Sequence, residues 1–220
     1  MSIAKRKRTY NSPRRQDQAL ATRRNILQAA RRLFAEQGYT TTTLAAIALA
    51  AGVSVPTVTA VYGTKFALLD ALIKSAVRGT LSPVPLAETP AWRAALQNPA
   101  PTAQLRQYAA NTRHIREQTA DIVGIVQGAA TADPEIAALL RGLGASRLQD
   151  NHLIAQALAR NQTLAPGMTV ERATDLLWTL SSAEVYRLLV VERGWLPGEY
   201  EQWLAAALIE QLLKEPGAQT

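Results

Sequence analysis

Groups that hydrogen-bond to phosphate recur at short intervals along residues 43–65. Hydroxyl and ammonium groups donate hydrogen bonds to phosphate oxygens, and small apolar side chains contact the methyl group of thymine. Both kinds of group occur in this segment, so their spacing predicts a surface that binds nucleic acid. The candidate contact residues are Thr43, Ser54, Val55, Pro56, Thr57, Thr59, Tyr62 and Lys65.

Residues 54–62, SVPTVTAVY, contain no Arg, Lys, Asn or Gln. The bidentate pairs of Arg with guanine and of Asn with adenine are therefore excluded for this segment. Base contacts would rest on the hydroxyl group of Thr57 and on Val55 and Pro56 against thymine methyl groups. The shape of the DNA should then contribute correspondingly more to recognition.

The individual roles leave alternatives open. Thr43, at a predicted helix N-terminus, would hold a phosphate with its hydroxyl group and the free N–H groups of the first turn. Lys65 would bind a phosphate with its full charge, or else lie solvated on the surface. Tyr62 would bind a phosphate through its hydroxyl group, or else serve only in packing.

Four helices must position these side chains. Apolar residues at helical spacing predict the first helix over about 17–37, and shorter helices follow at about 44–51 and 55–62. A fourth helix is predicted over about 65–78. Residues suited to helix caps and stops separate the four: Gly38, Thr43, Gly52, Ser54, Gly63 and Thr64.

The second and third helices are joined by a tight turn within LAAIALAAGVSVPTVTAVYG, residues 44–63. Ala48 is small where the two helices cross, Gly52 permits a left-handed backbone, and Val53 fills the gap beneath the turn. This pattern is typical of a helix-turn-helix, whose second helix lies in the major groove of DNA. An ordinary αα-hairpin is the alternative.

Charge is unevenly distributed along the chain. Residues 1–78 contain 13 Lys and Arg against 3 Asp and Glu, a net charge of +10, whereas residues 79–220 have a net charge of −3. This asymmetry favours a polyanion as the partner of the N-terminal part, although a basic tail that keeps the protein soluble is the alternative. A flexible arm is expected over residues 1–16. Its basic residues could enter a minor groove or attract DNA non-specifically: Lys5, Arg6, Lys7, Arg8, Arg14 and Arg15.

The stretch from about Arg24 to Leu72 resembles the DNA-binding domain of TetR-family transcriptional regulators. The matching segments are ILQAARRLFAEQGY and TTTLAAIALAAGVSVPTVTAVYGTKFALLDAL. The chain departs from the family pattern at Thr59 and Val61, where many relatives carry Tyr and His. Thr59 reaches less far toward a phosphate than Tyr does. The resemblance implies a helical body that binds a small molecule and dimerises.

The fold class predicted is all-α. The expected division is an arm at 1–16, a helix-turn-helix domain at 17–63 with a linking helix at 64–78, and a ligand-binding and dimerisation body at 79–220. Gly142 and Gly144 could split one of the body helices. After a proline-rich connector over 79–101, the long helices of the body are expected at about 102–130, 133–162, 169–193 and 198–214.

The last two helices, within 169–214, are apolar around much of their circumference. They would pair with their symmetry mates in a homodimer, as the resemblance implies, or form a buried hairpin within one chain. Arg113 and Arg116 could attract an acidic ligand or form a solvated basic face. The candidate ligand contacts, each of which could equally be a surface or core residue, are Tyr108, Asn111, His114, Gln127, Asn151, Trp178, Ser182 and Tyr186.

Other functional classes find little support. The chain lacks cysteine and contains only His114 and His152 as imidazole ligands, so no metal site is expected. Gly142-Leu143-Gly144 follows no strand and lacks the third glycine of a phosphate loop, so neither a cofactor, a catalytic residue nor enzymatic activity is expected. No apolar stretch approaches the ~20 residues of a membrane span, and a cytoplasmic location is expected.

The expected function is that of a sequence-specific transcriptional regulator bound to double-stranded DNA. As a repressor, it would be released from a near-palindromic operator by a small-molecule effector, whose identity the sequence does not indicate. The alternative is an architectural DNA-binding protein that responds to no ligand. The long helical body argues against that alternative, because the head alone would suffice for contact with DNA.

Overall fold

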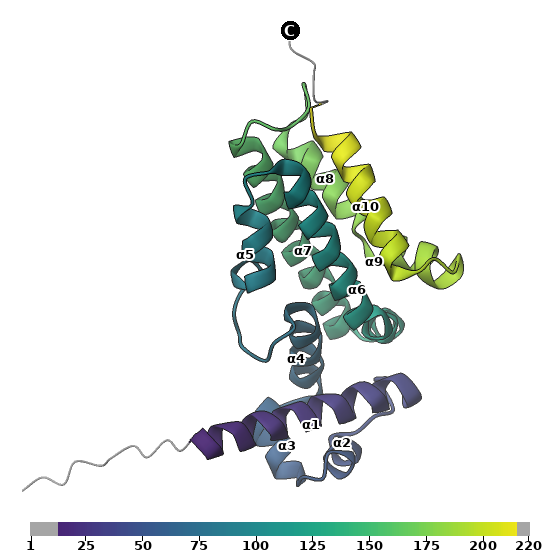
Figure 1. Cartoon of the computed structure of the whole chain (residues 1–220). Helices are drawn as coiled ribbons and strands as arrows, with labels where there is room; N and C mark the ends of the chain where they lie inside the picture. The colour runs from purple at the N-terminus through teal and green to yellow at the C-terminus, as the bar shows by residue number, and fades with distance from the viewer. Residues whose placement is uncertain (1–12, 215–220) are drawn as a thin grey trace, which may run out of the picture. The chain divides into compact units, whose positions relative to one another are not determined.

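The computed structural model describes residues 13–214, with side chains from residue 15 onward (Figure 1). These residues form helices joined by loops, apart from one isolated β-bridge between Leu164 and Leu213. The predicted all-α fold class is therefore confirmed. The chain divides into two compact units, here called the head (residues 1–72) and the body (residues 73–220).

The head contains α1 (Pro13–Gln37), α2 (Leu44–Ala50), α3 (Val55–Tyr62) and the first part of α4 (Lys65–Arg78). The first helix begins earlier than predicted, because Pro13 suits the first turn, where its missing N–H is not needed. Residues 13–16 of the expected arm are thus helical rather than flexible. Its other residues, including Lys5, Arg6, Lys7 and Arg8, lie outside the described part of the chain.

Hydrogen bonds at the helix ends confirm the predicted N-caps of α2 and α4. The hydroxyl oxygen of Thr43 accepts the N–H of Ala46 at 3.1 Å, and that of Thr64 accepts the N–H of Ala67 at 3.1 Å. Such N-caps satisfy N–H groups that have no partner within the helix. The glycines predicted to end α1, α2 and α3 adopt left-handed backbone conformations, with φ of +81° at Gly38, +67° at Gly52 and +74° at Gly63.

The core of the head forms where the apolar faces of these helices meet. Ile26 and Phe34 from α1, Ile47 from α2 and Val58 from α3 are fully buried. Burial of a side chain of this size contributes roughly 1.5–3 kcal/mol. Leu68 and Leu69 of α4 are also fully buried.

The body is a bundle in which α10 packs on α6, α8 packs on α7, and α6 contacts α5 and α7 (Figure 1). Its core contains Trp92, Tyr108, Ile154, Leu177 and Tyr200. The elements that follow α4 are η1 (Leu86–Glu88), α5 (Pro90–Gln97), α6 (Pro101–Ala130), α7 (Pro134–Arg160), α8 (Val170–Leu180), α9 (Ala183–Tyr186), a π-helix η2 (Arg187–Glu192) and α10 (Pro197–Leu212).

Two helix predictions for the body need correction. Gly142 and Gly144 do not split α7, which continues to Arg160. The helix predicted over 169–193 is instead broken after Leu180, because the hydroxyl of Ser182 accepts the N–H of Val185 and begins α9. A serine inside an apolar helical pattern can act as a cap, and here that local hydrogen bond replaces the continuous helix.

Gly142 and Gly52 form a matched pair for testing backbone conformation. Neither has an atom within 4 Å of the Cβ that an alanine would add, but only Gly52 has a positive φ. We expect Gly142→Ala to raise the free energy of unfolding by about 0.5–1 kcal/mol, as alanine favours a helix interior. Gly52→Ala should lower it by about 1–2 kcal/mol. Urea unfolding followed by circular dichroism checks both, and equal effects of the two substitutions would contradict the assignment.

Candidate functional site

The helix-turn-helix pair presents one face of α3 to solvent. The N–H of Val53 donates to the carbonyl of Ala48 at 3.0 Å and closes the turn between α2 and α3. Val58 is fully buried and fastens α3 to the head, whereas Val55 is 41% exposed. Pro56 and Thr59 are exposed as well. The outer face of α3 is therefore available to a groove of DNA.

The predicted hydroxyl groups at the start of α3 form a local pair. Ser54 Oγ accepts the N–H of Thr57 at 3.3 Å and lies 2.8 Å from Thr57 Oγ1. One hydroxyl of this pair donates to the other, so a single hydroxyl proton remains for an external acceptor. At Thr43 the hydroxyl oxygen accepts from α2, which leaves its proton able to reach a phosphate.

Lys65 is bound to the segment that connects α1 to α2. Its Nζ donates to the carbonyl oxygens of Tyr39 (2.8 Å), Thr40 (3.1 Å) and Thr42 (2.9 Å). The ammonium group also lies 4.4 Å from the centre of the Tyr39 ring. Contact with a phosphate would require Lys65 to release at least one of these carbonyl groups. These hydrogen bonds fix the position of the segment that precedes Thr43, the N-cap of α2.

Tyr62 is likewise engaged within the head. Its hydroxyl group donates to the carbonyl oxygen of Arg23 at 3.2 Å. Burial raises the pKa of the Tyr62 phenol, and the nearby charge of Arg23 partly opposes that effect. Its single proton cannot serve a phosphate while it is bound to α1. This geometry fits the alternative in which Tyr62 serves in packing rather than in binding a phosphate.

The body contains a cavity of about 570 Å³ with a mainly apolar lining. The linker helix α4 contributes Ile73 and Val77, while longer stretches of α6, α7 and the α8–α9 junction form the remaining walls. The candidate ligand contacts that line the cavity are Tyr108, Gln127, Asn151, Trp178 and Ser182.

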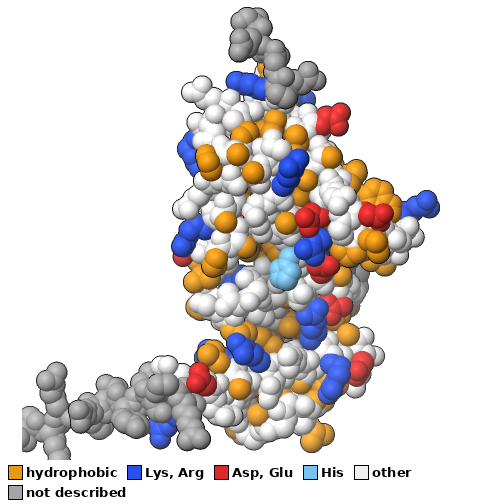
Figure 2. All heavy atoms as spheres, in the orientation of Figure 1, with side chains coloured by type: hydrophobic (Ala, Val, Ile, Leu, Met, Phe, Trp, Pro, Cys, Tyr) orange, Lys and Arg blue, Asp and Glu red, His pale blue; other side chains and the backbone are white. Residues whose placement is uncertain are grey.

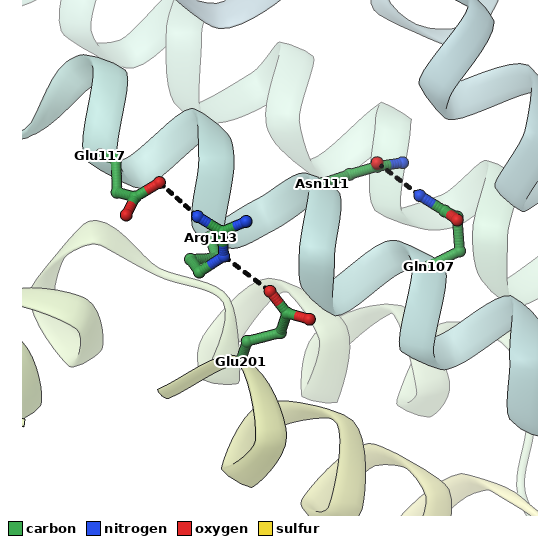
Figure 3. Close-up of polar contacts among 5 residues, drawn as sticks. All are labelled: Gln107, Asn111, Arg113, Glu117 and Glu201. Atoms are coloured by element: carbon green, nitrogen blue, oxygen red, sulfur yellow. Dashed lines mark hydrogen bonds and ion pairs between the residues drawn. The ribbon is translucent and has the colours of Figure 1, made fainter. Parts of the chain in front are cut away.

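The other three candidate contacts, Asn111, His114 and Tyr186, do not line this cavity. Asn111 joins two helices, since its Nδ2 donates to the carbonyl of Ala91 and its Oδ1 accepts from Gln107 (Figure 3). Tyr186 is buried against Tyr200, with ring centres 4.9 Å apart. His114 is exposed. The spacing of the sequence identified polar residues on these helices, but it could not show which of them would face the cavity.

Two neighbouring arginines of α6 have different surroundings. Arg113 forms ion pairs with Glu117 of the same helix and with Glu201 of α10 at 2.6 Å (Figure 3). Arg116 instead lines the cavity, as do Arg147 and Asp150 of α7. The sequence prediction missed the last two residues, because isolated charged side chains on a long helix usually lie on its solvated face.

The comparisons with known proteins agree with this architecture. Residues 26–72 match the family described as bacterial regulatory proteins, tetR family. Residues 26–72 are a TetR-family domain. The predicted family resemblance is therefore confirmed. No curated protein sequence matches the chain.

Solved structures extend the likeness of the TetR-family head to the whole fold. NalD of Pseudomonas aeruginosa, the secondary repressor of the MexAB-OprM multidrug efflux pump, is 23% identical with a TM-score of 0.67; the match covers 90% of this chain and 99% of NalD. A protein from Saccharomonospora viridis in complex with choline is 17% identical with a TM-score of 0.64, over 87% and 97% of the two chains. The flavonoid-responsive regulator FrrA is 21% identical with a TM-score of 0.60, over 90% and 98%.

The described residues show neither a metal-ligand cluster nor a single membrane-spanning helix. They contain no cluster of three or more His, Asp or Glu side chains that could hold a metal ion. Within residues 13–214 no single helix is long and apolar enough to cross a membrane, and α2 and α3 reach that length only together, across a bend of 108°.

The contacts of Lys65 lead to a test that separates positioning from phosphate binding. Lys65→Met leaves three carbonyl groups without their donor, so we expect the free energy of unfolding to fall by about 1–3 kcal/mol. Lys74→Met, an exposed lysine farther along α4, is the charge-matched control and should cost less. If Lys65 contacts a phosphate, its replacement should also flatten the slope of log affinity against log salt concentration by about one unit. An unchanged slope in Lys65→Met supports positioning, and a flattened slope without loss of stability contradicts it.

Proposed function

We propose that this chain is a sequence-specific transcriptional regulator that represses from a near-palindromic operator and is released by a small molecule bound in the body. The observation that carries the proposal is the TetR-family match over a helix-turn-helix with an exposed α3 face. The net charge of +10 over residues 1–78 supports a polyanion as partner. The cavity of about 570 Å³ supports a small-molecule effector, since ligand pockets commonly have this size.

In this proposal α3 lies in the major groove and the surrounding residues support it. Val55, Pro56 and Thr59 face base edges or the adjoining backbone, because they are exposed on the outer side of α3. Thr43 donates to a phosphate from the N-terminus of α2. Lys65 keeps the segment before Thr43 in place through its carbonyl contacts.

The proposed dimer interface lies within residues 169–214, where large apolar side chains remain exposed. Leu188 is 45%, Val191 65% and Leu196 67% exposed. Figure 2 shows hydrophobic side chains gathered on the body surface near η2 and the start of α10. Apolar patches of this kind mark association surfaces, and a two-fold axis would bury the same patch on both chains. Leu208, by contrast, is buried in its own chain and belongs to the core.

The regulatory part of the proposal depends on a difference in affinity between two states. A ligand releases the operator only if it binds the DNA-incompetent dimer more tightly than the competent one. The proposed link is α4, which begins with Lys65 in the head and supplies Ile73 and Val77 to the cavity wall. A change in the direction of α4 would alter the separation of the two α3 helices, which must match successive major grooves.

DNA binding by α3 is tested with Val55→Glu. A carboxylate on this face repels phosphates, so affinity for an operator selected from random duplexes should fall by at least about tenfold. Leu148→Glu is the matched control, because Leu148 is 42% exposed on α7 and Val55 is 41% exposed. Fluorescence anisotropy measures both affinities after circular dichroism has shown that both variants fold. Equal affinities for Val55→Glu and wild type would refute the placement of α3.

The dimer interface is tested by placing charge in the exposed apolar patch. Leu188→Glu combined with Val191→Glu should convert a wild-type dimer into monomers, since two like charges would face each other across the two-fold axis. Sedimentation velocity at micromolar concentration distinguishes the two states, and Leu148→Glu should remain dimeric. A monomeric wild type, or a dimeric double variant, would show that this patch is not the interface.

A further inference from the structure

Two guanidinium groups enter the wall of the body cavity beside the C-terminal end of α8. Nε and Nη2 of Arg116 donate to the carbonyl oxygen of Ser181 at 3.0 and 2.8 Å. Nη1 of Arg147 donates to the carbonyl oxygen of Trp178 at 2.5 Å, and its guanidinium carbon lies 4.5 Å from the centre of the Trp178 ring. The acceptors of both cations are thus backbone carbonyls and an aromatic face.

These contacts leave positive charge in the cavity uncompensated. Neither arginine forms an ion pair with a carboxylate among the described residues. The C-terminus of a helix supplies only about half a negative charge, against the full charges of two guanidinium groups. Burial lowers the pKa of both groups, and the charge of Arg116 lowers that of Arg147 further, to about 10. A guanidinium group nevertheless stays protonated in proteins at neutral pH. Charge that is buried without a counterion is costly, and a ligand anion would relieve that cost.

The polar groups without a partner in this cavity are hydrogen-bond donors. A guanidinium group carries more N–H bonds than Arg116 and Arg147 use here. Asn151 Nδ2 and Trp92 Nε1 are buried, belong to residues that line the same cavity, and have no partner among the described residues. A ligand that satisfies these groups must present acceptor atoms.

The acidic residues of the cavity do not neutralise the arginine pair. Burial raises the pKa of Asp150 to about 6, and the charge that opposes this effect is that of Arg78 on α4 rather than Arg116 or Arg147. Glu184 is exposed, and its carboxylate accepts a hydrogen bond from Gln127. Its charge is only a minor influence on the pKa of either arginine. The wall near Ser181 therefore stays positive.

We propose that the cavity binds an organic anion with an apolar or aromatic body, whose acidic group is held by Arg116 and Arg147 beside the α8–α9 junction. This inference rests on the proposed function in that it takes the cavity to be the effector site. The apolar walls accept the ring or chain of the ligand, and the volume of about 570 Å³ admits a molecule of drug size. Uncharged molecules of the same shape bind more weakly, because they leave the guanidinium groups without a counterion.

Two fluorescent probes with the same ring system test the charge preference. The anion 8-anilino-1-naphthalenesulfonate and the neutral N-phenyl-1-naphthylamine differ only in the sulfonate group. We expect the full-length protein to bind the anion at least about tenfold more tightly, with one site per chain by calorimetry. Similar affinities for the two probes, or no binding of the anion, would overturn the proposal.

Variants locate the preference at the arginine pair. In Arg147→Gln the affinity for the anion should fall by about tenfold or more while the affinity for the neutral probe changes less than about twofold. Arg147→Lys should retain most of the preference. Arg113→Gln, which removes the half-buried ion pairs with Glu117 and Glu201 outside the cavity lining, is the control and should leave both affinities unchanged. Equal losses for both probes in Arg147→Gln would mean that the variant damages the cavity and that charge recognition lies elsewhere.

An operator-binding assay separates this inference from the proposed function. If the anion fills the site through Arg147 and leaves DNA affinity unchanged, the ligand class stands and regulation by release fails. If a neutral compound binds the cavity and releases DNA while the anion does not bind, regulation stands and the proposed ligand class fails.

Discussion

The organisation of the body depends on how the C-terminal end of α8 is satisfied. A helix ends with carbonyl groups that lack an intrahelical partner, and burying them unpaired would cost more than most single contacts contribute. Here Arg147 binds the carbonyl of Trp178, and Arg116 binds that of Ser181. Side chains from α6 and α7 therefore converge on one point of α8. The same convergence places two cations in the wall of the cavity, so a structural requirement has created a chemically selective surface.

The head uses a similar solution at the end of α1. The carbonyl groups of Tyr39, Thr40 and Thr42 follow that helix, and the ammonium group of Lys65 binds all three. In both units a partly buried cation pairs with backbone carbonyls. In the head these contacts use the donors of the lysine fully, which fits a positioning role. In the body the planar guanidinium groups retain donors, which fits a role in binding.

Local features of the head could be predicted from the sequence because their causes are local. A hydroxyl side chain at Thr43 or Ser54 caps the helix that follows it, and Gly52 adopts the backbone that the turn requires. The role of Lys65 was not predictable in this way, since its acceptors lie more than 20 positions earlier in the chain. Helical spacing shows which residues share a face, but it does not show which element that face will meet.

The same limit explains the outcome in the body. Tyr108 and Asn151 were predicted as ligand contacts and line the cavity, where the hydroxyl of Tyr108 donates to Asn151 Oδ1. The sequence did not predict that Arg147 and Asp150 line the cavity, because charged residues with polar neighbours in sequence usually lie on the solvent-exposed face of a helix. The break after Leu180 was missed too, since the apolar pattern continues through Ser181 and Ser182. Charge and helix breaks acquire their meaning here only from the packing of α6, α7 and α8.

The position of the cations also restricts how a ligand could act on DNA binding. At physiological salt the influence of an exposed charge falls off over a Debye length of about 8 Å, so neutralising two partly buried arginines has little direct effect on a polyanion that lies farther away than this. Coupling must therefore pass through elements that change position when the cavity is filled. Helix α4 is such an element, since Ile73 and Val77 contact the cavity and Lys65 holds the connection to α2. A ligand that fits the cavity without shifting α4 would bind tightly and leave the operator occupied.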